Sequence, residues 1–308
     1  GDGNIVAIGS TGSDNVEIEM FIDYPFNGIT TLTDAGKVKI YQYSNENWVQ
    51  LGQDIWGEGY MDMSGGRNRV SLSNDGFTVA IGAPSNDNNT NNPTINSGHV
   101  RIYTYNNTSQ IWEQKGTDIN GASNQQFGYS VSLSNDGNII AIGAKTETYT
   151  GFVRMYEYIE NDWIQIGNTI NAVAYNDLFG YNLSINGAGN RVAIGGFQND
   201  TNGEDSGHVR IYDYNNDTWE QIGDDIYGES ENENLGYYVA LNDGGNILAI
   251  GSRGTENDLE DEGNVKIYQY DNSNWTQITS SIVGENSDDH SYVVSLNANG
   301  NMLAIGAP

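Results

Sequence analysis

A short acidic stretch, residues 200–205, carries side chains whose type and spacing suit a metal ion. Asp200, Asn202, Glu204 and Asp205 surround Gly203. Closely spaced oxygen atoms around a glycine turn are the ligands that a hard cation such as Ca²⁺ prefers. The stretch therefore predicts a calcium site, and a solvated turn of Asn, Asp and Gly is the alternative.

Aromatic side chains suggest a second kind of chemistry, the stacking of sugars. Tyr pairs followed by a Trp recur at Tyr41/Tyr43 with Trp48, Tyr103/Tyr105 with Trp112, Tyr156/Tyr158 with Trp163, Tyr212/Tyr214 with Trp219, and Tyr268/Tyr270 with Trp275. An aromatic fixed to a repeat position more often fills the space between neighbouring units, so we expect these rings in the core. Trp56 lies outside the pattern, in the Gly-rich segment 56–66, and is the candidate for an exposed, ligand-binding aromatic.

Basic residues also occupy one repeated position, just before each Tyr pair. They are Lys39, Arg101, Arg154, Arg210 and Lys266. One interpretation is a ring of cations that binds an anionic ligand. We favour a structural role, in which each aliphatic stem packs across a sheet and each charged head meets a local carboxylate or carbonyl.

These residues recur because the chain repeats one phrase five times and begins a sixth copy. The phrase is a strand ending in A-I-G, an Asn/Asp/Gly-rich loop, a strand [KR]-[IM]-Y-x-Y, a polar turn, a Trp and a final G-x-x-I. Within it, residues 129–133 alternate in polarity and Asn135-Asp136-Gly137 then predicts a hairpin turn. Apolar residues nowhere keep a helical period, so the sequence predicts an all-β fold with four short strands per unit.

A four-stranded antiparallel unit repeated about every 55 residues is typical of a β-propeller blade. We expect one propeller domain over residues 1–308, with units at about 1–66, 67–122, 123–176, 177–230 and 231–284 and a partial unit at 285–308. Five blade equivalents are the favoured count, with residues 291–296 closing the ring against the N-terminal strands. A fragment of a seven-bladed propeller is the alternative.

Two further motifs recur around the first two strands of the unit. Phe127-Gly128, Phe179-Gly180 and the near match Leu235-Gly236 stand before a first strand, and Gly82-Ala83-Pro84 follows a second strand. In these motifs the chain resembles the FG-GAP repeat family of integrin α-subunit propellers and bacterial surface proteins. The resemblance implies an extracellular or cell-surface propeller with a role in adhesion. Integrin-type calcium sites use a D-x-D-x-D-G loop between the first and second strands, and here that loop is only Asn-Asp-Gly, which puts the inherited calcium site in doubt.

Composition limits the partners. The chain has 41 acidic and 12 basic residues and a formal net charge of -29, which disfavours nucleic acid and anionic membranes. No run approaches the roughly 18 apolar residues of a membrane span, so we expect no membrane insertion. There is no Cys, so packing alone must hold the fold.

The sequence contains no G-x-S-x-G, H-E-x-x-H or phosphate-binding loop. His99 and His208 start equivalent strands, which favours a packing role. We therefore expect a non-enzymatic binding or adhesion module, whose partners are a protein or glycan on a cell surface and other domains of a larger chain. The alternatives are a propeller-type carbohydrate-active enzyme, which needs a carboxylate pair at the axis, and a structural spacer. Function should lie where the repetition breaks, at residues 10–34, at 56–66 and in the unequal acidic loops.

Overall fold

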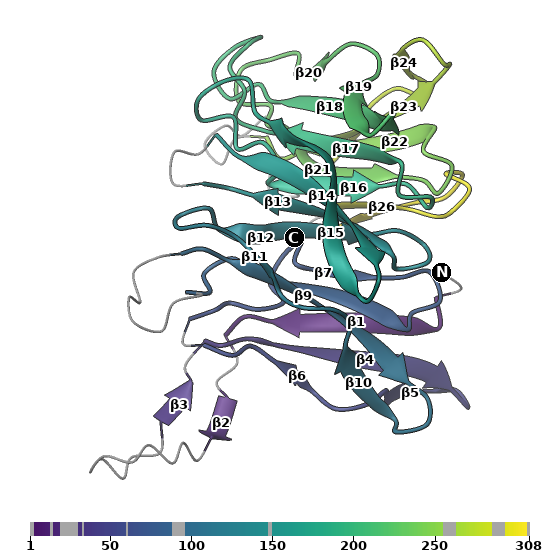
Figure 1. Cartoon of the computed structure of the whole chain (residues 1–308). Helices are drawn as coiled ribbons and strands as arrows, with labels where there is room; N and C mark the ends of the chain where they lie inside the picture. The colour runs from purple at the N-terminus through teal and green to yellow at the C-terminus, as the bar shows by residue number, and fades with distance from the viewer. Residues whose placement is uncertain are drawn as a thin grey trace.

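The computed structural model describes residues 3–12, 15–18, 30–32, 34–59, 61–87, 96–146, 150–254, 263–284 and 293–306, and all regular elements in these ranges are β strands (Figure 1). Most of segment 10–34 and of the acidic loop 252–262 lies outside the described residues. The prediction of an all-β fold built from four-stranded antiparallel blades is confirmed. No helix in the described part of the chain is long and apolar enough to cross a membrane.

Five antiparallel sheets follow one another along the chain, and we number them blades 1 to 5. Blade 1 contains β1 (Ile5–Ser10), β4 (Lys37–Ser44), β5 (Asn47–Gln50) and β6 (Ile55–Trp56). Blade 2 contains β7 (Val70–Leu72), β8 (Thr78–Ala83), β9 (His99–Asn106), β10 (Ile111–Gln114) and β11 (Ile119–Asn120). Blade 3 contains β12 (Phe127–Leu133), β13 (Ile139–Ala144), β14 (Phe152–Ile159) and β15 (Asp162–Asn171).

Blade 4 contains β16 (Asn182–Ile185), β17 (Arg191–Gly196), β18 (His208–Asn215), β19 (Thr218–Gln221) and β20 (Ile226–Tyr227). Blade 5 contains β21 (Leu235–Leu241), β22 (Ile247–Ser252), β23 (Asn264–Tyr270), β24 (Trp275–Gln277) and β25 (Ile282–Val283). A hairpin of β2 (Asn15–Ile18) and β3 (Thr30–Leu32) projects from blade 1, and β26 (Val293–Leu296) pairs with β27 (Leu303–Gly306) (Figure 1).

The first strands of successive blades, β7, β12, β16 and β21, lie side by side, and β26 continues the series. Among the described residues β26 pairs only with β27, and β1 pairs only with β4. The expected closure of the ring by residues 291–296 is therefore wrong for the described strands. The physical reason is that β26 forms its strand hydrogen bonds with β27, where closure would need β26 to pair with β1. β26 is therefore the first strand of a further blade and does not complete blade 1.

The tight turns between first and second strands are joined in a chain of hydrogen bonds around the axis. The backbone N–H of Asn74 donates to the carbonyl of Asn135 at 2.9 Å, and that of Asn135 donates to Gly187 at 2.9 Å. Gly187 donates in turn to Asp243 at 3.0 Å, and Asp243 to Ala298 at 3.1 Å. These bonds fix each turn against the next blade. They also give partners to backbone N–H and C=O groups that do not pair within a sheet.

Paired glycines explain why F-G and A-I-G recur. Gly82 ends the A-I-G of blade 2, and a Cβ placed on it would lie 2.2 Å from the carbonyl oxygen of Gly128 in blade 3. Gly128 has φ +85°, a conformation that side chains rarely adopt. Phe127, directly before it, is fully buried. The motif thus lets two backbones touch while the preceding large side chain fills the space between blades.

The prediction that the repeated aromatics lie in the core is confirmed for four of the five fourth-strand tryptophans, whereas Tyr43 is 45% exposed. Trp112, Trp163, Trp219 and Trp275 are all buried. The indole Nε1 of Trp112 donates to the carbonyl of Leu51 in blade 1 at 2.7 Å, and that of Trp163 donates to Lys115 in blade 2 at 2.7 Å. Trp48 of blade 1 is 50% exposed, because no described blade precedes it.

This contrast gives a stability prediction. Trp112→Ala should lower the free energy of unfolding by about 3–5 kcal/mol, because it opens a cavity between blades 1 and 2. Trp48→Ala should cost less than about 1 kcal/mol, because its ring covers little. Urea unfolding followed by circular dichroism measures both. Equal losses in the two variants would contradict the role of the tryptophan as the contact between blades.

Candidate functional site

The two faces of the propeller differ in the connections that they carry. Antiparallel strands place the turns between strands one and two and between strands three and four on one face, which we call the turn face. Connections between strands two and three, and from one blade to the next, lie on the other, which we call the loop face. Residues 57–59, 61–69, 197–207 and 228–234 belong to the loop face. The β2–β3 hairpin joins strands two and three of blade 1, so it belongs there too (Figure 1).

The repeated basic position is satisfied locally in every blade, which confirms the structural interpretation. The pairs are Lys39 with Asp54 at 3.3 Å, Arg101 with Asp118 at 3.1 Å, Arg210 with Asp225 at 2.5 Å, and Lys266 with Glu233 at 2.7 Å. Arg154 donates to the Thr169 hydroxyl at 3.2 Å and lies over the Phe152 ring at 4.6 Å. An anionic ligand would have to displace these partners, so they do not form an open ring of cations.

Trp56 belongs to the repeat, and the expectation that it lies outside is wrong. It pairs with Lys37 in the ladder of β6 and β4, as Tyr227 pairs with His208 in blade 4. The Lys37 ammonium lies 4.8 Å from the Trp56 ring centre, a cation–π contact, and the ring is half-buried. A ligand-binding role for Trp56 stays a prediction.

Residues 200–205 form a closed turn on the loop face. Asp200 Oδ1 accepts the backbone N–H of Asp205 at 2.8 Å, and the Asn202 amide donates to the Gly228 carbonyl at 3.0 Å. Burial raises the pKa of Asp205, and the charges of Asp200 and Glu204 raise it further. Asp200, Asn202 and Glu204 are exposed. Calcium binding here stays a prediction, since two of the four side chains already hold the turn.

Buried acids anchor the loop face, and sequence reasoning missed them. Asp62 is 1% exposed, and its Oδ2 accepts the backbone N–H of Gly59 at 2.6 Å and the Asn86 amide at 3.0 Å. Asp177, also 1% exposed, accepts the Asn199 amide at 2.9 Å in the same way. The signal that would have found them is an acid two residues before the pairs Ser64-Gly65, Phe179-Gly180 and Leu235-Gly236, although Gln125 stands at this position before Phe127-Gly128. Asp62 and Asp177 each tie a connection between blades to the neighbouring loop.

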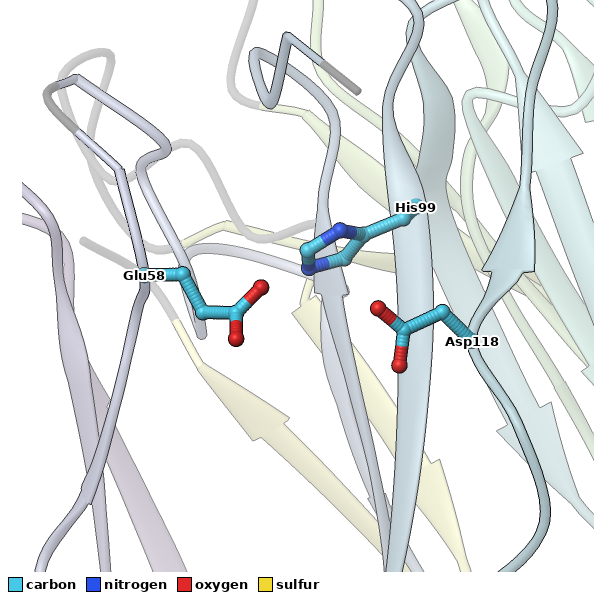
Figure 2. A group of neighbouring side chains, drawn as sticks. All are labelled: Glu58, His99 and Asp118. Atoms are coloured by element: carbon cyan, nitrogen blue, oxygen red, sulfur yellow. The ribbon is translucent and has the colours of Figure 1, made fainter. Parts of the chain in front are cut away.

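Three potential metal ligands meet where blade 1 contacts blade 2 (Figure 2). Glu58 follows β6, His99 starts β9, and Asp118 lies directly before β11. One ligand atom from each lies within 4.8 Å of the others, and the imidazole points between the two carboxylates (Figure 2). His99 is 3% exposed, whereas the side chains of Asp118 and Glu58 are 27% and 52% exposed. Within the described residues, this is the group of three His, Asp or Glu side chains that lie close enough together to hold one metal ion.

Electrostatics at this cluster are set by Arg101. Its guanidinium forms ion pairs with both Glu58 and Asp118. Burial alone would raise the pKa of Asp118, but hydrogen bonds from Arg101 and its charge outweigh burial and hold that pKa below its usual range. Burial, and then the Arg101 charge, lower the pKa of His99. The cluster therefore places an ionised Asp118 carboxylate beside a neutral His99 imidazole near neutral pH.

Among the described residues, the lining of the axial cavity of about 330 Å³ contains no carboxylate, imidazole, ammonium or guanidinium group. Its lining consists of Asn68, Val70, Val131, Ser132, Asn182, Leu183, Ser184, Tyr238, Val239, Ala240, Leu241, Val294, Ser295 and Leu296. Glycosidic hydrolysis needs two carboxylates about 5–10 Å apart. The described lining offers none, so it lacks the pair that the enzymatic alternative requires.

No model of a known family and no curated protein matches the chain. Solved structures do. The periplasmic gluconolactonase PpgL of Pseudomonas aeruginosa matches with a TM-score of 0.56 and 12% identity, over 87% of this chain and 71% of that one. The β-propeller domain of the Trilobed protease from Pyrococcus furiosus matches with a TM-score of 0.47 and 10% identity, over 85% of this chain and 67% of that one.

TolB from Acinetobacter baumannii matches with a TM-score of 0.46 and 12% identity, over 82% of this chain, and the chain spans 50% of the length of TolB. At such identities a likeness shows the fold alone. The match to PpgL, with the blade topology described above, shows a β-propeller repeat fold that is open and incomplete among the described residues.

The repeated ion pairs generate a prediction for blade 5. Lys266 is 4% exposed and pairs with Glu233, which is 6% exposed, whereas Lys39 and Asp54 are 33% and 24% exposed. Glu233→Gln should lower the free energy of unfolding by about 3 kcal/mol, because it removes the buried charge partner of the ammonium and leaves only the exposed Glu229, at 3.3 Å. Asp54→Asn should cost less than about 1 kcal/mol, because water screens that pair. Urea unfolding compares them, and a larger loss for Asp54→Asn would contradict this account.

Proposed function

We propose that the chain is a non-enzymatic extracellular binding module that contacts its ligand through the loop face. Its FG-GAP-like motifs and its likeness to a periplasmic propeller support a place outside the cytoplasm. The ligand is a glycan or a protein on a cell surface. A role in adhesion as part of a larger chain follows from the same resemblance.

One observation carries the proposal, namely the contrast between the two faces. The turn face repeats short Asn-Asp-Gly turns joined blade to blade, so it changes little around the ring. The loop face carries connections that differ in length and charge, anchored from below by Asp62, Asp177 and Glu233. Variable loops held on a rigid scaffold are where binding contacts usually lie.

The enzymatic alternative has weaker support in the geometry. PpgL is a gluconolactonase, and the fold that it shares with this chain also serves non-catalytic proteins. The described lining of the axial cavity offers no carboxylate, and the charged side chains of the repeat already pair with each other. We therefore do not propose lactone or glycoside hydrolysis for this chain.

Binding of the whole chain to an array of glycans and purified cell-surface proteins tests the proposal. A loop-face variant, Asp200→Asn/Glu204→Gln/Glu231→Gln, should weaken binding to the best ligand by about tenfold, a change of roughly 1.4 kcal/mol. The turn-face control, Glu46→Gln/Glu160→Gln/Asp217→Asn, removes three exposed acids as well and should bind like the parent. Absence of any ligand, equal effects of both variants, or hydrolysis of gluconolactone by the parent would contradict the proposal.

A further inference from the structure

The cluster of Glu58, His99 and Asp118 has the donor set of a transition-metal site. Imidazole nitrogen with carboxylate oxygens suits Zn²⁺ and its neighbours in the first transition row, whereas Ca²⁺ takes oxygen ligands. The three ligand atoms lie within 4.8 Å of one another. A small movement of the exposed Glu58 side chain would bring them to one ion, with water completing the coordination.

His99 provides an observation that is independent of the carboxylates. Its side chain is almost fully buried, at 3% exposure, and points between Glu58 and Asp118 (Figure 2). One nitrogen of its ring lies within 4.8 Å of a carboxylate oxygen of Glu58 and of one of Asp118.

The repeat shows that this combination is specific to one boundary. The residues that correspond to Glu58, His99 and Asp118 can be compared at the other three boundaries. They are Ala122, Phe152 and Thr169 between blades 2 and 3; Val173, His208 and Asp225 between blades 3 and 4; and Glu229, Asn264 and Ser281 between blades 4 and 5. Each of these lacks at least one ligand, so the packing between blades does not require all three.

Arg101 is the cation that the metal must replace. Its guanidinium now neutralises Glu58 and Asp118. Arg210 holds Asp225 in the same way between blades 3 and 4, where Val173 takes the place of Glu58. The pairing of Arg101 with Asp118 is therefore a contact of the repeat. Glu58 adds a second carboxylate beside the His99 imidazole.

We propose that Glu58, His99 and Asp118 bind one divalent transition-metal ion, best matched by Zn²⁺, at the loop-face boundary of blades 1 and 2. When the ion enters, the Arg101 side chain leaves the two carboxylates and turns toward solvent. The ion links the connection after β6 to strand β9 and to the end of blade 2, so it stabilises the loop face where blades 1 and 2 meet.

Calorimetric titration of the EDTA-treated whole chain with Zn²⁺ tests this. The parent should bind about one ion tightly, above the weak binding that any acidic surface shows. Glu58→Val and His99→Phe introduce residues that the repeat uses at these positions, and each should weaken the tight site by more than about tenfold. Arg101→Met should strengthen binding, because it removes the competing cation.

The boundary of blades 3 and 4 offers a matched gain of function. Val173 is 62% exposed, so Val173→Glu should fold, and Tyr227→Asn frees Asp225 from the Tyr227 hydroxyl, which donates to it at 2.8 Å. The double variant places Glu and Asn where the boundary of blades 1 and 2 has Glu58 and Asn120. It should therefore create a second Zn²⁺ site and raise the number of tight sites from about one to about two. Thermal unfolding in EDTA checks that each variant is folded.

Three results would overturn the proposal. They are no tight Zn²⁺ binding by the parent, binding that Glu58→Val and His99→Phe leave unchanged while the variants are folded, and weaker binding in Arg101→Met. The ligand-binding experiment on the loop face is separate, because its variants leave Glu58, His99 and Asp118 intact. Either proposal can therefore fail without the other.

Discussion

Coverage of one blade by the next is the constraint on which the rest of this structure depends. A four-stranded sheet cannot bury both of its faces, so each blade presents an apolar surface that only a neighbour can cover. The chain meets this need with a few contacts that recur along the series of blades. A tryptophan seats its indole on the preceding blade, facing glycines bring two backbones together, and a hydrogen bond joins the turns near the axis. The basic residue of each third strand is held by a partner close by.

Because the tryptophan contacts and the turn hydrogen bonds use the interior and the turn face, the exposed side chains of the loop face are free to vary. Its connections do not complete strand ladders, and buried acids such as Asp62 and Asp177 hold their bases in place. Differences in loop sequence therefore change the surface without changing the packing. The Glu58, His99 and Asp118 cluster arises in this way, from one glutamate added to a boundary whose other residues already belong to the repeat.

The sequence predicted the parts of the structure that local patterns encode. Alternating polarity and the Asn-Asp-Gly turns specified β12 and β13, and the spacing of Trp112 and Trp163 identified them as packing residues. Features that depend on contacts between distant segments were missed. Glu58 and His99 belong to different units and meet only across a boundary, so no spacing reveals them. Trp56 was misplaced because β6 is only two residues long, too short to show a strand pattern.

The chain of hydrogen bonds between turns runs in one direction. At every step, from Asn74 to Ala298, the earlier blade donates and the later blade accepts. Each blade thus has a donor side and an acceptor side. The series of blades therefore has a direction, as a polymer of subunits joined head to tail has. A copied unit inserted at any boundary would find an acceptor ahead and a donor behind, so duplication of a unit within the gene preserves every contact. The length of such a propeller can therefore change by whole blades without the invention of a new interface.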